Sequence, residues 1–166
     1  QGRVWKRRLY MRADDPKRLD KVLIHELTHV VLADHFAQHQ IPRWADEGIA
    51  VLSEPAERQN ELRRWLNDEA TQGRVFSLQQ LVTQRELPGD KRLGDLFYAQ
   101  SSSLVEFLLA ERHLTERQVL RFVAETESRG LDSALARWFP NVSPVSLDSA
   151  WRQWMKTPRA DGAIAE

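Results

Sequence analysis

Helix signals follow one another along nearly the whole chain after residue 13, and this succession constrains the fold more than any other feature. Asp14-Asp15-Pro16 supplies a helix N-cap and a proline suited to a first helical turn. Apolar residues then recur at the 3.6-residue period. The predicted helices cover 16–36, 44–53, 56–71, a short stretch opened by the Ser77–Gln80 capping box, 96–111, a stretch from the capping box at Thr115 to Gly130, 132–139 and 147–156.

Only residues 3–13 show a different pattern. Apolar and basic side chains alternate there, which predicts one half-exposed strand. Its five basic residues favour a charged edge strand that resists pairing with other sheets, with a polyanion-binding patch as the alternative. The predicted fold class is therefore α+β, mainly helical, with a small N-terminal β-sheet.

The length and composition exclude several classes of function. A length of 166 residues predicts a single domain over 1–166, and the start at Gln1 leads us to expect a fragment of a longer chain. Lys and Arg together number 24, as do Asp and Glu, so no charge excess favours nucleic acid. The longest uncharged apolar stretch, Val30–Ala33, is far too short for a membrane span. The absence of cysteine excludes disulfides, thiolate metal sites and thiol nucleophiles.

The chemistry is concentrated in the first long helix, where His25-Glu26-Leu27-Thr28-His29 forms an HExxH motif. Residues four apart differ by about 40° around a helix axis, so both imidazoles leave the same face and can bind one metal ion. Glu26 lies about 100° further round the axis, beside the ion rather than on it. That is the place of a general base that takes a proton from the attacking water.

A catalytic zinc needs a third protein ligand, and two residues compete for the role. His35 has the spacing of the third histidine in metzincins, but position 32 is Leu instead of the Gly that breaks the helix there. In an unbroken helix His35 faces away from His29, so we interpret it, and His39, as solvent or capping residues. Glu47 is the preferred ligand because a second helix would bring it back, and its apolar neighbours disfavour an unpaired surface carboxylate.

The motif pair also carries a family resemblance. His25 to His29, followed by Trp44-x-x-Glu47-Gly48-x-Ala50, resembles the gluzincin zinc peptidases, and most closely the compact peptidase MA-like domains related to the large zinc aminopeptidases. The segment from Tyr98 to Leu108 resembles the one in which a tyrosine points at the zinc, and the C-terminal Trp151-Arg152-Gln153-Trp154 is similar to their last helix. The Gly-x-Met-Glu-Asn exopeptidase element of the aminopeptidases is not present.

The resemblance implies a zincin-like domain with one Zn²⁺ per chain bound by His25, His29 and Glu47. It implies Glu26 as the general base, Tyr98 as the stabiliser of the oxyanion, a peptide or protein as substrate, and an extracytoplasmic location. From the residues alone, the preferred interpretation of Tyr98 is an amphipathic core residue, so its role at the oxyanion rests mainly on the resemblance. We expect an acceptor for each His Nδ1, with Asp46 as a candidate. The alternative function is a catalytically inactive scaffold for protein interaction.

Overall fold

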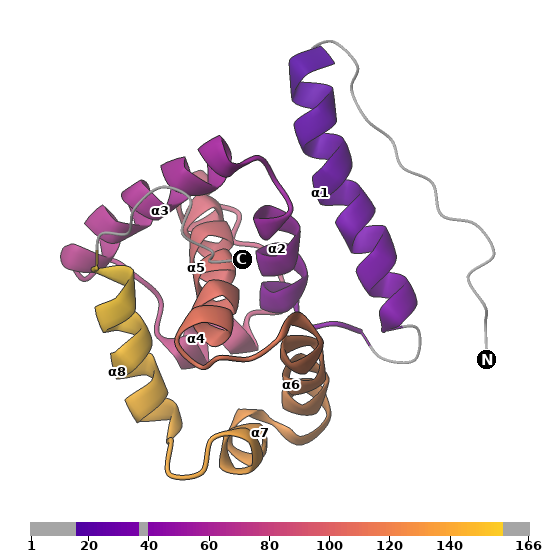
Figure 1. Cartoon of the computed structure of the whole chain (residues 1–166). Coiled ribbons are helices and arrows are strands. Elements are labelled where there is room, and N and C mark those ends of the chain that lie inside the picture. Colours follow the sequence, from indigo (N-terminus) through magenta and orange to yellow (C-terminus); the bar gives the residue numbers. More distant parts are fainter. Residues whose placement is uncertain (1–15, 37–39, 158–166) are drawn as a thin grey trace.

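The structure, a computed structural model, describes residues 16–36 and 40–157. The regular elements of these residues are helices, arranged as Figure 1 shows. In chain order they are α1 (Pro16–His35), α2 (Arg43–Leu52), α3 (Ala56–Thr71), α4 (Leu78–Thr83), α5 (Lys91–Ala110), α6 (Glu116–Arg129), α7 (Leu131–Trp138) and α8 (Pro144–Met155). The described residues thus form an all-helical fold, which confirms the mainly helical part of the predicted α+β class. No strand of the expected N-terminal β-sheet is found among them, and the predicted strand over 3–13 lies outside them.

Helix α5 forms the centre of the molecule, with α2, α3, α4, α6 and α8 packed around it (Figure 1). Every residue from Ala99 to Leu108 is buried, as expected of a helix that other helices enclose on all sides. The buried amide of Gln100 is satisfied by the backbone of Phe76, donating to its carbonyl at 3.1 Å and accepting from its N–H at 2.7 Å. This enclosed helix provides the rigid support on which α2 rests.

Helix α2 approaches α5 closely at Gly48. A Cβ atom at this position would lie 2.5 Å from the carbonyl oxygen of Ser101 and 2.7 Å from its carbonyl carbon. Backbone atoms cannot turn aside as a flexible side chain can, so any other residue would push α2 away from α5. The bare face of Gly48 therefore meets α5 and not α1.

Helix α1 lies at the edge of the cluster and packs mainly on α2 (Figure 1). Leu32 is buried, and the partly buried Phe36 packs against the core. Leu27 and Val31 are among the periodic apolar residues that predicted this helix, yet the described residues leave Leu27 48% exposed and Val31 67% exposed. The period therefore predicted the helix correctly, but α2 covers a different face from the one that the apolar stripe indicated.

Capping signals were accurate markers of where helices begin. The capping boxes at Ser77 and Thr115 are both present, with the side chain of each accepting from the backbone N–H three residues later. Helix α3 has the predicted bounds.

In the described residues, no helix combines the length and the hydropathy needed to cross a lipid bilayer.

Two predicted starts were wrong. Helix α5 begins at Lys91 instead of residue 96, because the Asp90 carboxylate accepts from the N–H of Leu93 at 2.9 Å and so caps the first turn of the helix. Helix α8 begins at Pro144 instead of residue 147, because Ser143 caps it. The earlier start of α5 gives Tyr98 two helical turns of support before it.

Candidate metal centre

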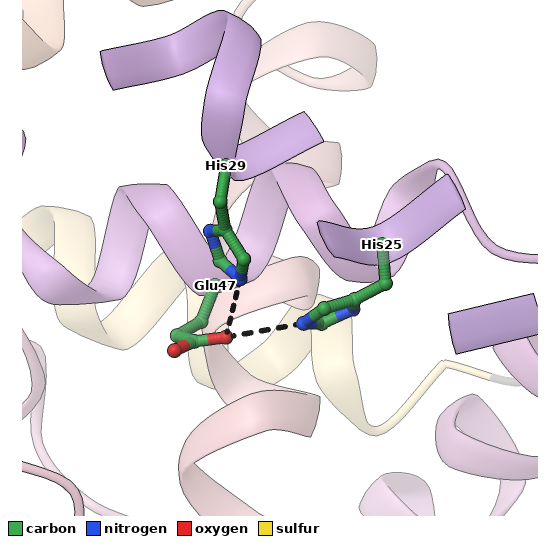
Figure 2. A group of neighbouring side chains, drawn as sticks. All are labelled: His25, His29 and Glu47. Carbon is green, nitrogen blue, oxygen red and sulfur yellow. Dashed lines mark ion pairs between the residues drawn. The ribbon is translucent and has the colours of Figure 1, made fainter. Parts of the chain in front are cut away.

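Three side chains from two helices converge on one point. His25 and His29 leave the same face of α1, and Glu47 leaves α2 (Figure 2). The Oε2 atom of Glu47 lies 3.4 Å from Nε2 of His25 and 3.5 Å from Nε2 of His29. One ligand atom from each residue lies within 4.8 Å of the other two. The structure thus brings together the three residues that the sequence analysis predicted as metal ligands.

These distances fit a tetrahedral metal ion. Zn²⁺ binds nitrogen and oxygen ligands at about 2.0–2.2 Å, so two ligand atoms of one tetrahedral site lie about 3.3–3.6 Å apart. Glu47 Oε2 is buried and makes no hydrogen bond. When the imidazoles are neutral with Nδ1 protonated, two Nε2 lone pairs and a carboxylate oxygen face one another. The two nitrogen atoms and the oxygen atom repel one another unless a cation lies between them.

The other oxygen of Glu47 is already occupied. Oε1 lies 2.9 Å from a guanidinium nitrogen of Arg43, four residues earlier on α2. Burial raises the pKa of Glu47, but the contacts with His25 and His29 and the charge of Arg43 outweigh this and lower the pKa to about 2. Glu47 is therefore an anion at all physiological pH values, with Oε2 as the oxygen that is left for a metal.

Each imidazole is held by a second carboxylate through its other ring nitrogen. Nδ1 of His29 lies 2.7 Å from Oδ1 of Asp46, and Nδ1 of His25 lies 2.7 Å from Oε1 of Glu54. Such contacts fix the tautomer with Nδ1 protonated and leave the Nε2 lone pair for a metal. Asp46 thus takes the acceptor role for which it was a candidate. The contact of Glu54 with His25 was not predicted. Its position just beyond the end of the helix that carries Glu47 could have indicated it as an acceptor.

The same carboxylates determine the basicity of the two histidines. Burial lowers the pKa of His25, but the contacts with Glu47 and Glu54 outweigh it and raise the pKa to about 9. The contacts with Asp46 and then Glu47 raise the pKa of His29 to about 10, against the effect of burial. Without a metal, protons therefore take the place of the cation that the geometry requires.

Tyr98 and Glu26 lie beside this centre without being part of it. Tyr98 projects from α5, half-buried, with its ring centroid 6.4 Å from that of His25. Burial, followed by the negative charges of Glu47 and Glu26, raises the pKa of its hydroxyl, while Arg43 opposes the shift. The hydroxyl is thus protonated and able to donate a hydrogen bond. Glu26 is half-buried on α1 and belongs to no metal-binding group of the described residues.

The other two histidines of the described residues do not belong to this group of side chains. His35 is exposed in the last turn of α1, with its ring 5.1 Å from that of Phe36. His113 is exposed just beyond the end of α5. His39 lies outside the described residues. Among the described residues, His35, which has the spacing of the third metzincin histidine, therefore belongs to no group that could hold a metal ion.

A family model described as the Peptidase MA superfamily matches residues 15–157. The match spans α1 to α8 and so includes the helices that carry His25, Glu47 and Tyr98. Comparisons with curated proteins and with solved structures found no significant match.

Proposed function

The chain belongs to the Peptidase MA superfamily, and from this premise we propose that it is a zinc-dependent metallopeptidase that hydrolyses peptide bonds in peptide or protein substrates. In this proposal His25, His29 and Glu47 bind one Zn²⁺ per chain. Glu26 is the general base, and Tyr98 stabilises the oxyanion.

One observation carries the proposal. A buried carboxylate oxygen without a hydrogen bond faces two imidazole nitrogens at 3.4 and 3.5 Å, and each imidazole is oriented by a further carboxylate. Two His and one Glu are the ligand set of a known class of catalytic zinc sites, which keep a fourth position open. A structural zinc site is closed by four protein ligands, whereas the described residues supply three at this centre.

When bound, zinc supplies Lewis-acid polarisation of the scissile carbonyl and makes water reactive at neutral pH. Glu26 accepts the proton of the attacking water as the new C–O bond forms. The Tyr98 hydroxyl donates a hydrogen bond to the carbonyl oxygen as negative charge develops there. Glu26 then passes its proton to the amine nitrogen as the C–N bond breaks, so atoms and charge balance without any redox step.

The decisive experiment combines metal analysis with a peptide-library digest. Purified protein should contain one zinc per chain, and zinc-loaded protein should cleave members of the library that the chelated protein leaves intact. Zinc without cleavage, in the presence of all proposed catalytic groups, would favour the inactive scaffold. The cleavage sites also distinguish an endopeptidase from an exopeptidase.

Tyr98→Phe is expected to lower kcat by about 10²–10³-fold, because an oxyanion donor acts mainly in the transition state. KM, zinc content and melting temperature should change little. A core role predicts the reverse: removing a buried, bonded hydroxyl costs about 1 kcal/mol of stability and spares the chemistry. Steady-state kinetics and a melting curve on the same preparations separate the two.

Zinc affinity is expected to fall as the pH is lowered from 8 to 6. The pKa values of about 9 for His25 and about 10 for His29 mean that the metal-free site holds protons in this range, and zinc must displace them. Release of one to two protons corresponds to about 10- to 100-fold weaker binding per pH unit. Competition with a chelator of known pH dependence measures this. A zinc affinity that is flat over these two units would show that the imidazoles are already neutral.

A further inference from the structure

The turn between α2 and α3 carries one of the carboxylates that hold the metal centre. Glu54 follows the α2 C-cap residue Ser53, and its side chain accepts from Nδ1 of His25 at 2.7 Å. The Ser53 hydroxyl accepts from Thr28 on α1 at 2.8 Å and donates to the carbonyl of Ala50 at 2.7 Å. The position of this turn therefore sets where Glu54 meets His25.

Gln59, in the first turn of α3, holds the same turn from the other side. Its Nε2 donates to the carbonyl oxygen of Leu52 at 2.9 Å and to that of Glu54 at 2.7 Å. Carbonyls at the end of a helix have no partner within the helix, so one amide group satisfies two acceptors that would otherwise depend on water. These two bonds fix the backbone of Glu54 relative to α3.

The Gln59 amide is itself oriented from the core. Its Oε1 accepts from Arg63 at 3.1 Å, one helical turn further along α3. Arg63 in turn donates from Nε to the buried carboxylate of Glu106 on α5 at 2.9 Å. Because Oε1 faces a guanidinium, Nε2 must face the two carbonyls. Hydrogen bonds thus link the central helix through Arg63 and Gln59 to the backbone of Glu54, whose side chain contacts His25.

We propose that Gln59 is a positioning residue for the metal centre, acting through Glu54 on His25. The inference rests on the proposed function, since it requires that His25 bind zinc. Gln59 itself touches no metal ligand. Its effect is to keep the Glu54 carboxylate in the place where it fixes the His25 tautomer and leaves Nε2 free for zinc.

The same helix offers a matched control. Asn67 on α3 donates from Nδ2 to the carbonyl of Met155 on α8 at 3.1 Å, also a bond between a side-chain amide and the backbone of another helix. No hydrogen bond links Asn67 to the metal centre in the described residues. Gln59→Met and Asn67→Leu should both lower the melting temperature of the metal-free protein by about 2–4 °C. A purely structural role for Gln59 predicts that the two variants also bind zinc equally well.

Chelator competition with Zn²⁺ as the probe separates the two roles. Gln59→Met should raise the zinc Kd by about 3- to 10-fold, less than the 10- to 100-fold typical of a direct partner such as Glu54, while Asn67→Leu leaves it within about 2-fold. Gln59→Glu, of nearly the same size, should have an effect at least as large because it turns a carboxylate toward two carbonyls. In a Glu54→Ala background, Gln59→Met should add nothing further.

Equal zinc Kd values for the Gln59→Met and Asn67→Leu variants would overturn the inference, as would a full additional effect of Gln59→Met in the Glu54→Ala background. Wild-type protein that binds zinc but cleaves no peptide would refute the proposed function, and the comparison of zinc Kd values would still decide the role of Gln59. Wild-type protein that binds no zinc would overturn both.

Discussion

In the Glu26→Gln variant, peptide hydrolysis is expected to fall by about 10²–10⁴-fold, while zinc content and melting temperature stay at their wild-type values. Gln has nearly the shape of Glu but cannot accept the proton of the attacking water. Glu26 is half-buried on α1, and the group of side chains that could hold a metal ion consists of His25, His29 and Glu47 without it. The loss should therefore appear in the rate and not in the binding of zinc.

A control from the same helix tests whether a lost carboxylate anywhere on α1 has this effect. Asp34→Asn makes the same exchange of acid for amide two turns further along α1, at an exposed position, and should keep wild-type activity. If no peptide or protein is cleaved better by wild type than by the Glu26→Gln variant at equal zinc content, the inactive scaffold becomes the better interpretation.

His29→Ala should lose zinc altogether under conditions in which wild type retains it through purification. Changing a residue that only supports a ligand costs about 10- to 100-fold in metal affinity, so removing one of three ligands should cost more. The His35→Ala variant is the matched control, because His35 lies exposed on the same helix and away from the centre. Metal analysis of the three proteins gives the result directly. Zinc that persists in the His29→Ala variant and is lost in the His35→Ala variant would reverse the ligand assignment.

The same variant should loosen the attachment of α1. This helix packs mainly on α2, and the contacts of His25 and His29 with Glu47, Asp46 and Glu54 lie at that junction. Metal binding and local folding are therefore linked here. Amide hydrogen exchange should speed up over α1 in the His29→Ala variant and stay slow over the enclosed helix α5.

One feature of the site and several helix boundaries follow from short-range patterns in the sequence. The positions of His25 and His29 on one face depend only on the geometry of a single helix, and helix starts at Ser77 and Thr115 depend on bonds that span three residues. The two wrong starts have the same local origin. Asp90 and Ser143 cap their helices a few residues before the apolar stretches at which these helices were predicted to begin.

The amino-acid pattern alone was enough to predict that α1 is a helix with two imidazoles on one face, and to make Glu47 the preferred candidate for a third metal ligand. Other contacts became visible only in the folded chain: Gly48 meets α5, Asp46 holds His29, Glu54 holds His25, and Gln59 holds the turn between α2 and α3. The two sets of features differ in how far apart the interacting residues lie along the sequence. A helix and its caps arise from interactions over three or four residues, whereas these contacts join residues between 5 and 53 positions apart, such as Gln59 with Glu54 and Gly48 with Ser101, and form only where two helices approach each other.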